Sequence, residues 1–580
     1  MRILKAGLIA AIAAVIAIAN LDAVTRVPSA DGQFWDIQDT SPWAQDSGGI
    51  ATGGRANPFN GFGYLKLQVR RADNSLLARN QYLRGFGLHH DGAGRFDSIT
   101  PVLTEGILVT RDVTTTKETQ YLRYFDAFTN SANEDRIVQV AFGGAAGAYD
   151  DGGQVAIAAT SNGDRRIDLS DAFVTVMQNA NKAANPALGP SGHGPSAHVV
   201  GSKPGLLTSI GDMYGDPFAD AYPGFDPAHI AYVFTLRLRP GETRALVTFV
   251  VKGLSEVYDP RGGYPIPFKD ALTTGEAVYS GADAKIPAPG SEIKRVTGIA
   301  AELVKSPDLR GLSTRQRSQI ANWNIPAANA GPFTVFEKTV SELQSALTKG
   351  DVTSEDVVRE YLARLSLYDR HGPTFRSVLA LNPRAIAVAR ARDAERAAGR
   401  ARGPFHGVPI VLKDNIDTTE LPSTGGSLAL VDHRPRLDSR VAAGMKQGGA
   451  IILGKANLDE FPFGDFGIST VGGTVGNAYD PSLSTAGSSG GSATAVAASL
   501  AALGFGTDTC NSLSNPSGFA SLATIRATRG LLSRAGVMPL NTYNDAVGPM
   551  AKSVTDVALA LDLVTGSRRG DAVTNDASGH

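Results

Sequence analysis

The pattern of hydrophobic residues changes near residue 300 of this 580-residue chain, and this change limits the folds that the chain can adopt. Before it, short runs of β-branched and aromatic residues alternate with turns, without helical patterns between them. After it, helical patterns alternate with short apolar runs. The first pattern predicts an all-β domain and the second an α/β domain. We therefore expect a multidomain protein in which these two architectures follow one another.

The predicted β-rich domain extends over residues 31–288, and the sequence assigns it no role. Its strand-like runs are 107–116, 121–125, 137–142, 155–160, 172–177, 232–238 and 245–251. Segments rich in Gly, Asn, Asp and Ser join most of these runs, as turns require. Many short strands without intervening helices predict an antiparallel sandwich. The last two runs flank Pro240-Gly241, which is typical of a β-hairpin.

Three segments partly match ligand-binding motifs. Residues 449–456 approach the phosphate-binding loop, but position 456 is Ala, which has no hydroxyl for Mg²⁺. Neighbouring side chains on a strand point to opposite faces, so we expect His89-His90 to form a surface loop rather than a metal site. Asn162-Gly163-Asp164 favours a hairpin turn over a calcium loop.

Residues 289–334 contain several prolines and predict a linker with one short helix. The α/β domain then extends over residues 335–580. Its helical patterns cover 341–347, which Gly350 closes, 357–365 after Thr353-Ser354, and the Ala/Arg-rich stretch 383–398. Its apolar, strand-like runs are 408–412, 450–453 and 503–505.

The N-terminus predicts the compartment. Residues 1–23 have the layout of a signal peptide, with Arg2 and Lys5, an apolar run over 6–19, and a small-residue cleavage pattern at 17–19. The alternative, a membrane anchor, needs about 20 apolar residues. We therefore expect a secreted or periplasmic protein without a stable membrane span after cleavage. One cysteine excludes an intrachain disulfide.

The charge of the chain is balanced, with 55 Lys and Arg against 56 Asp and Glu, giving a formal net charge of −1. Proteins that bind nucleic acid through a polybasic surface carry a clear positive excess. The sequence therefore predicts no nucleic-acid partner.

Three segments of the α/β region combine residues that can carry chemistry. Lys413 follows an apolar run, where burial lowers the pKa of a lysine and makes it a usable base. Ser488 and Ser489 lie within a Gly/Ser stretch, and Ser512 lies in a later turn-like segment. A serine hydroxyl is a weak nucleophile and needs such a base nearby. Each segment alone is a weak signal, but their order along the chain is informative.

The order and spacing of these segments resemble the amidase signature family. Lys413 precedes Ser488 by 75 residues, and Ser488 precedes Ser512 by 24. Residues 408–417, 486–491 and 506–514 resemble the family's lysine, G-G-S-S-G-G and G-T-D-x-G-G-S-I-R segments. Further similar segments are 453–461, 528–539 and 545–556, so the resemblance covers roughly residues 335–570.

The resemblance implies a mixed sheet flanked by helices and a Ser–cis-Ser–Lys triad. Ser512 would attack an amide carbonyl, and Ser488, held by a cis peptide, would pass the proton to neutral Lys413. Backbone N–H groups of residues 509–512 (Thr509, Cys510, Asn511 and Ser512) would form the oxyanion hole. The partner would be a small-molecule amide, and neither a metal nor an organic cofactor is implied.

The chain departs from the family pattern in three ways. Cys510-Asn511 replaces Gly-Gly before Ser512; Asn tolerates a left-handed backbone, and Cys510 is expected to be a small buried residue. Ser514 replaces an Arg. The chain stops at His580, before the C-terminal half of the family domain, so we expect a truncated domain.

Three functions fit these observations. The first is an exported amidase. The second is the glutaminase subunit of a tRNA-dependent amidotransferase, against which the predicted signal peptide and sandwich domain argue. The third is a surface or carbohydrate-binding β-sandwich protein with an inactive amidase remnant, which Ser514 and the missing C-terminal half favour. The oligomeric state stays open.

Overall fold

Antiparallel strands make up most of the chain before residue 329, and a mixed sheet with helices makes up the rest. The computed structural model describes residues 24–30, 34–39, 46–52, 59, 61–146, 154–164, 166–179, 194–219, 229–253, 291–326, 328, 330–566 and 571–575. The chain divides into two compact units, Met1–Ala328 and Asn329–His580. The predicted signal peptide, residues 1–23, lies outside the described residues.

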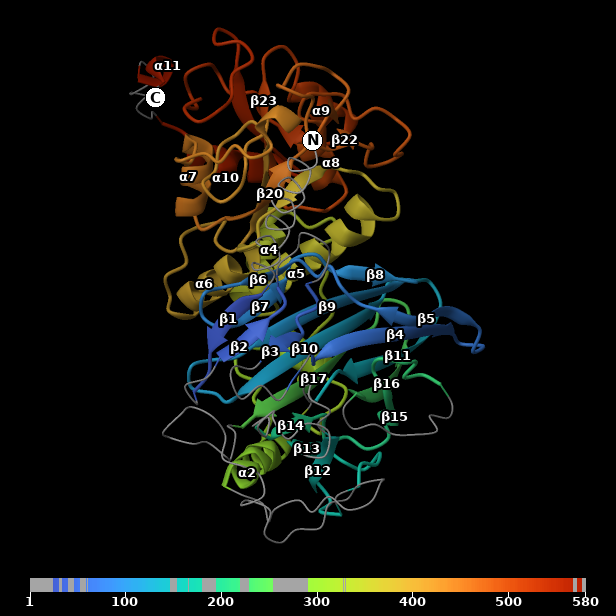
Figure 1. Cartoon of the computed structure of the whole chain (residues 1–580). Helices are drawn as coiled ribbons and strands as arrows, with labels where there is room; N and C mark the ends of the chain where they lie inside the picture. The colour runs from blue at the N-terminus through green and yellow to red at the C-terminus, as the bar shows by residue number, and fades with distance from the viewer. Residues whose placement is uncertain are drawn as a thin grey trace, which may run out of the picture. The chain divides into compact units, whose positions relative to one another are not determined.

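The described part of the first unit contains three antiparallel sheets (Figure 1). The largest has the order β12-β13-β14-β17-β10-β9-β7-β6, with β8 beside β9; the second has the order β15-β16-β11-β4-β5, and the third β1-β2-β3. The strands are β1 (Thr25–Pro28), β2 (Phe34–Ile37), β3 (Ile50–Thr52), β4 (Tyr64–Arg71), β5 (Leu76–Tyr82), β6 (Leu88–His90), β7 (Arg95–Ser98), β8 (Val102–Thr104), β9 (Ile107–Thr114), β10 (Tyr121–Asn130), β11 (Arg136–Gly143), β12 (Gln154–Thr160), β13 (Phe173–Asn179), β14 (Ser196–Val199), β15 (Leu207–Asp212), β16 (Ile230–Leu238) and β17 (Thr243–Lys252).

The two larger sheets share one hydrophobic core. Leu122 and Tyr124 of β10 belong to the same buried cluster as Val138 and Val140 of β11, although the strands lie in different sheets. Alternate residues of a strand point to the same face, so each sheet turns one apolar face towards this cluster. The β-rich region expected from the sequence is therefore present.

The predicted hairpin around Pro240-Gly241 is wrong. Strand β16 pairs with β11 and β15, whereas β17 pairs with β10 and β14, so the turn crosses between sheets. Both strands have a neighbour on each side and no free edge for one another. The chain also passes from one sheet to the other between β10 and β11. The buried side chain of Asn130, at the end of β10, donates to the carbonyls of Glu134 and Leu238, both at 2.9 Å, and so connects the two crossings.

Two smaller predictions in the first unit have different outcomes. The hairpin around residues 162–164 is confirmed, because β12 and β13 pair antiparallel on either side of it. The loop expected at His89-His90 is wrong, since both residues lie in strand β6. His90 stacks on Phe96 with 4.6 Å between ring centroids, and this packing favours a strand over a loop at the surface.

The segment predicted as a linker, 289–334, differs most from expectation. It contains helices α2 (Ser291–Lys305) and α3 (Thr314–Gln319). Val296 and Ala300 of α2 pack with Val247 and Phe249 of β17 in a second hydrophobic cluster. Helix α2 lies beside β13 and β14 in Figure 1. The apolar stripe of this helix therefore covers the sheet face that points away from the shared core.

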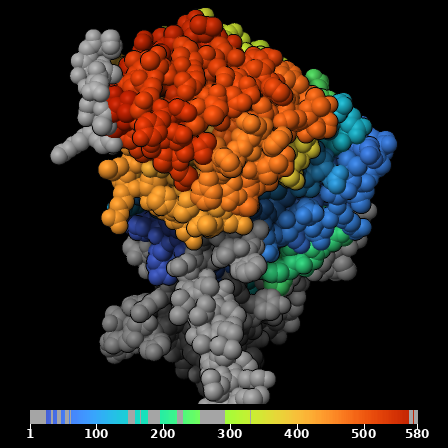
Figure 2. Space-filling view, turned by 90° about the horizontal axis from the view of Figure 1, so that it is seen from above, coloured from blue at the N-terminus to red at the C-terminus, as the bar shows by residue number. Residues whose placement is uncertain are grey.

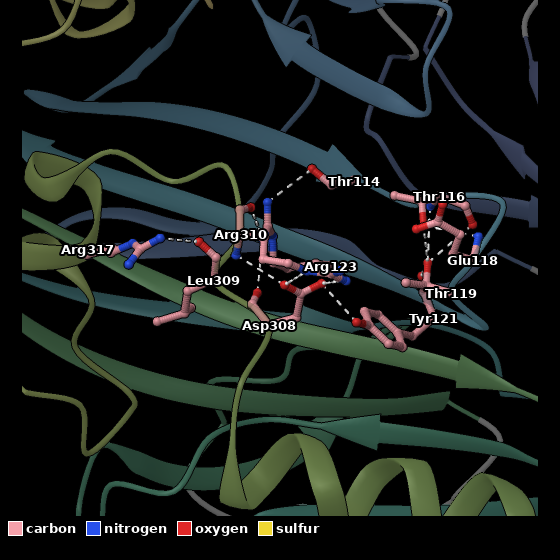
Figure 3. A network of polar contacts seen from close by, with 10 residues as sticks. All are labelled: Thr114, Thr116, Glu118, Thr119, Tyr121, Arg123, Asp308, Leu309, Arg310 and Arg317. Carbon is pink, nitrogen blue, oxygen red and sulfur yellow. Dashed lines mark hydrogen bonds and ion pairs between the residues drawn. The ribbon is translucent and has the colours of Figure 1, made fainter. Parts of the chain in front are cut away.

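A polar network fixes the segment after α2 to strand β10 (Figure 3). The buried guanidinium of Arg123 donates to the carbonyls of Asp308 (2.9 Å) and Arg310 (2.8 Å). The Tyr121 hydroxyl donates to the Asp308 carboxylate at 2.8 Å. Burial lowers the pKa of Arg123 to about 10. Within the sheet, Arg123 also donates to Thr114 Oγ1 at 3.4 Å, and the two carbonyls add stronger acceptors for this buried cation.

The second unit is built on one mixed sheet of order β18-β20-β19-β23-β25-β24. A short ribbon, β21-β22, lies outside it. The strands are β18 (Val378–Leu381), β19 (Pro409–Lys413), β20 (Ile451–Ala456), β21 (Ile468–Ser469), β22 (Gly473–Thr474), β23 (Leu503–Asp508), β24 (Ala523–Thr524) and β25 (Ala546–Ala551). The helices are α4 (Val340–Lys349), α5 (Ser354–Arg364) with a π-helical turn (Leu365–Arg370), α6 (Ala385–Ala397), a 3₁₀ turn (Leu428–Leu430), α7 (Arg440–Gln447), α8 (Gly490–Ala497), α9 (Ser514–Phe519), α10 (Val554–Val564) and α11 (Ala572–Asn575).

The sequence signals for this unit are confirmed in place. Thr339 caps α4 in a capping box with Glu342, and Gly350 ends the helix with a φ of 76°. Thr353 caps α5 in the same way with Asp356. The Ala/Arg-rich stretch forms α6, and the three apolar runs form β19, β20 and β23.

The centre of the mixed sheet is buried on both faces. Strand β19 runs parallel to β20 and β23, and every residue of the three strands is buried. This explains why their sequences are continuous apolar runs rather than alternating patterns. The yellow-to-red segments of this unit pack closely against each other in Figure 2. Because β19 and β23 are parallel, their carboxyl ends, Lys413 and Asp508, lie at the same edge.

No helix among the described residues is long and apolar enough to cross a membrane.

Candidate active site

Lys413, the last residue of β19, is fully buried at the carboxyl edge of the sheet. Its Nζ lies 2.7 Å from Ser488 Oγ and 2.9 Å from Thr507 Oγ1, with the Thr507 carbonyl at 3.3 Å. The structure therefore brings together two of the three predicted catalytic residues, which are 75 positions apart in the chain. Thr507, in strand β23, is a member of the site that sequence reasoning missed.

Burial lowers the pKa of Lys413 from 10.5 to about 7, although the negative charges of Asp459, Asp508 and Asp545 act in the opposite direction. A neutral amine has two N–H donors and one lone pair. The two oxygens of Thr507 can accept both N–H groups, which leaves the lone pair for the Ser488 hydroxyl. The contacts thus suit an amine that accepts a proton from Ser488.

Ser488 lies just before helix α8, and the Gly487–Ser488 peptide bond is cis. Its carbonyl accepts the backbone N–H of Asp459 at 3.2 Å. Gly487 packs so tightly on the Asp459 carboxylate that a Cβ would overlap Oδ2. The Asp459 carboxylate accepts N–H groups from 466–468 as well, so it joins the Ser488 turn to a neighbouring loop. No motif in the sequence indicates this role of Asp459.

Ser512 lies in the loop between β23 and α9 and is buried. Its carbonyl accepts the backbone N–H of Ser489 at 3.0 Å, which places this loop against the start of α8. Within the described residues, no hydrogen bond joins the hydroxyls of Ser512 and Ser488. The structure therefore places Ser512 against Ser489, the residue after Ser488, without closing the hydrogen-bonded chain.

The four backbone N–H groups predicted as the oxyanion hole belong to Thr509, Cys510, Asn511 and Ser512. Among the described residues, none of these groups donates to a protein acceptor. Neither Cys510 nor Asn511 has a positive φ, so the loop does not need the left-handed backbone that Asn tolerates. Cys510 is exposed, and the prediction of a small buried residue is wrong. Its position in a loop beyond the end of β23 accounts for this exposure.

The carboxylate of Asp508, at the end of β23, accepts hydrogen bonds from the residues that follow Ser512. One carboxylate oxygen, Oδ2, accepts the backbone N–H groups of Leu513 (3.0 Å) and Ser514 (3.2 Å) and the Ser514 hydroxyl (3.2 Å). The other oxygen, Oδ1, accepts Arg526 Nε at 3.0 Å. Ser514, at the position of the family's Arg, therefore contacts Asp508 directly. The contact between Arg526 and Asp508 is visible only in the folded structure, because no sequence motif links the two residues.

A cavity of about 190 Å³ is lined by Thr507, whose hydroxyl accepts from Lys413 Nζ, but not by Lys413 itself. Asn415 lines it and donates to Thr507 Oγ1 at 3.1 Å, which continues the hydrogen bonds from Ser488 and Lys413. Its Oδ1 is buried and has no partner among the described residues. The lining also includes Thr509, Asp545, Met538 and Arg534, but neither Ser488 nor Ser512.

A buried ion pair lies one residue beyond Lys413, at Asp414. Lys455 Nζ is 3.1 Å from the Asp414 carboxylate and donates to Ser423 Oγ at 2.8 Å. Asp414 also accepts the backbone N–H of Thr424 at 2.9 Å. This pair holds the 422–426 segment beside the carboxyl edge of the sheet.

Residues of the second unit are similar to known amidases and related enzymes. The family model Amidase matches residues 356–578. A glutamyl-tRNA(Gln) amidotransferase subunit of Chloroflexus aurantiacus is 38% identical over 229 residues, which is 39% of this chain and 46% of that protein. A putative amidase of Arthroderma benhamiae is 35% identical over 268 residues, covering 42% of this chain and 45% of that protein.

Among solved structures, the peptide amidase of Stenotrophomonas maltophilia shares 40% identity over 43% of this chain and 52% of that chain, with a TM-score of 0.42. The chain spans about half the length of the curated relatives that it matches.

Proposed function

Residues 356–578 belong to the amidase signature family, and from this premise we propose that the chain hydrolyses an amide C–N bond. One observation carries the proposal. Lys413 is fully buried, its pKa is lowered to about 7, and its Nζ lies 2.7 Å from Ser488 Oγ. A buried lysine held against a serine hydroxyl suits a general base better than a structural cation, which would have a carboxylate partner.

In the proposed reaction, Ser512 Oγ attacks the carbonyl carbon of the amide. The Ser512 proton passes to Ser488 Oγ while the Ser488 proton passes to Lys413 Nζ, so the lysine becomes an ammonium. The backbone N–H groups of residues 509–512 stabilise the oxyanion, and each such donor contributes roughly 10²–10³ in rate.

The return of the proton completes each half of the reaction. The Lys413 ammonium, through Ser488, protonates the leaving nitrogen as the C–N bond breaks, and an ester to Ser512 remains. Water then attacks this ester with the same relay as base, which releases the carboxylic acid and restores Ser512. The Ser512 hydroxyl must turn towards Ser488 for this step, and catalytic hydrogen bonds often close only when substrate binds.

Labelling with a fluorophosphonate probe tests the proposal. We expect wild-type protein to be labelled and Ser512→Ala to stay unlabelled, with Lys413→Met and Ser488→Ala labelled far more slowly. Ser517→Ala is a matched control, because this buried serine lies five positions beyond Ser512 in helix α9. Absence of labelling that depends on Ser512 would contradict the proposal and favour a β-rich protein with an inactive amidase-like domain.

The relatives favour a second candidate, the glutamine-hydrolysing subunit of an amidotransferase. Several of them are named as glutamyl-tRNA(Gln) amidotransferase subunits, and these names support this candidate better than a free-standing exported amidase. Ammonia release separates the two. A preference for free glutamine over simple carboxamides and amidated peptides supports the amidotransferase candidate, and the reverse preference supports an amidase.

Export of the protein is a separate proposal and rests on residues 1–23 alone. Cell fractionation tests it, with a variant that replaces the apolar run 6–19 by a polar one as control. We also propose that the two larger sheets of the first unit form a sandwich, since one hydrophobic cluster contains side chains of both.

A further inference from the structure

We propose that Arg526 is a positioning residue for the nucleophile loop, residues 508–514, through its ion pair with Asp508. The inference deepens the proposed function and rests on it for its catalytic meaning. The geometric part, that Arg526 keeps the loop in place, concerns the fold of the second unit alone.

The contacts form a clamp with Asp508 at its centre. Asp508 is fully buried at the end of β23, and its Oδ2 accepts the two amides that directly follow Ser512, those of Leu513 and Ser514. Its Oδ1 accepts Arg526 Nε at 3.0 Å, and Arg526 Nη2 donates to the Asn544 carbonyl at 2.8 Å. The guanidinium thus connects the loop to the segment that leads into β25.

Arg526 supplies the only cation that pairs with Asp508 among the described residues. A buried carboxylate that loses its cation is costly to keep dry, so water enters to solvate it. That water competes with the amides of Leu513 and Ser514 for the carboxylate. The position of Ser512 therefore depends on a residue that is 14 positions away in the chain.

The same ion pair acts on Lys413 electrostatically. Three carboxylates raise the pKa of Lys413, those of Asp459 after β20, Asp508 in β23 and Asp545 before β25. Among the described residues, Asp508 alone of the three forms an ion pair, and its partner is Arg526. Removing the guanidinium leaves the Asp508 charge unopposed, so the lysine holds its proton to higher pH.

Hydrogen–deuterium exchange of the full chain tests the clamp without requiring activity. We expect the amides of Leu513 and Ser514 to exchange about tenfold faster or more in Arg526→Met, because a charge-assisted bond is weakened. Arg526→Lys keeps the charge and should stay near the wild-type rate. Arg529→Met is the matched control, since Arg529 is exposed nearby and forms no ion pair within the described residues.

The pH dependence of fluorophosphonate labelling tests the effect on catalysis. For Arg526→Met we expect the midpoint of labelling to move up by about one pH unit. In Arg526→Lys and Arg529→Met it should not move. Adding Ser514→Arg to Arg526→Met should restore both readouts, because the Ser514 hydroxyl already lies 3.2 Å from the Asp508 carboxylate.

The outcomes separate the two proposals. If exchange at residues 513–514 and the labelling midpoint both stay at wild-type values in Arg526→Met, the inference is wrong. If exchange rises but no variant, including wild type, is labelled, the clamp stands and the proposed function fails. If Arg526→Met does not fold, the double variant Arg526→Lys with Ser514→Arg is measured instead. The clamp requires the amides of Leu513 and Ser514 in this variant to exchange no faster than in wild type, and faster exchange overturns the inference.

Discussion

Replacing Lys413 by Met should remove activity and yet make the second unit more stable at neutral pH. The folded pKa of about 7 lies below the unfolded value of 10.5. At pH 7 and below, the lysine of the unfolded chain is protonated, and burying that charged ammonium lowers the free energy of unfolding. Each pKa unit equals about 1.4 kcal/mol, so the buried lysine costs about 5 kcal/mol at low pH.

The expected gain is smaller than this cost, because the bonds of Nζ to Ser488 and Thr507 are lost as well. Each of them contributes about 0.5–1.5 kcal/mol. We therefore expect Lys413→Met to raise the free energy of unfolding by about 2–4 kcal/mol at pH 7. Between pH 7 and 10.5 the unfolded chain binds more protons than the folded chain, so wild-type protein gains stability as pH rises.

The pH dependence is the sharper part of this prediction. From pH 7 to 9.5 the advantage of Lys413→Met should shrink by about 3 kcal/mol. Lys349→Met, at the exposed end of α4, should show no such trend. An advantage of Lys413→Met that does not change with pH would refute the reasoning that burial lowers the pKa of this lysine.

The assay must follow the second unit by itself. All three tryptophans, Trp35, Trp43 and Trp323, precede residue 329, so tryptophan fluorescence reports on the first unit. Hydrogen exchange of peptides from residues 330–566, measured at increasing urea concentrations, reports the stability of the second unit directly.

Three further outcomes follow from the site. Activity should fall below about pH 7 as Lys413 becomes protonated, which the pH profile of kcat/KM measures. Gly487→Ala should abolish labelling of Ser512 and lower stability by about 1–3 kcal/mol, because the added Cβ overlaps the Asp459 carboxylate. Lys455→Met should cost about 3–5 kcal/mol because it leaves the buried Asp414 charge unpaired; equal stability of this variant and wild type in urea would contradict that reasoning.

The local parts of the second unit could be predicted because their signals lie within a few residues. The caps of α4 and α5, Gly350 and the continuous apolar runs each specify one element without reference to the rest of the chain. The order of Lys413, Ser488 and Ser512 led to the proposed site through the family resemblance, not through local signals. The hydrogen bond between Lys413 and Ser488 then follows from two parallel strand ends and the start of one helix.

What the sequence did not reveal depends on contacts between distant segments. Thr507, Asp459 and Arg526 are ordinary polar residues in the sequence, and only the fold brings each of them to Lys413, Ser488 or Asp508. The hairpin around Pro240-Gly241 failed for the same reason, since turn residues indicate where the chain reverses but not which strand it meets. Helix α2 falls within the predicted linker because prolines stand before and after it.

The pairing of distant strands in the first unit has a consequence for its synthesis. Strand β10 meets β17 along its length, and the hydroxyls of Thr129 and Thr243 are 2.8 Å apart although 114 residues separate them. A ribosome adds about 5–20 residues per second, so roughly 6–23 s pass between the synthesis of β10 and that of β17. Strand β11 likewise waits for β16. During that interval the nascent chain exposes apolar strands with open edges, and its yield should depend on chaperones that shield them.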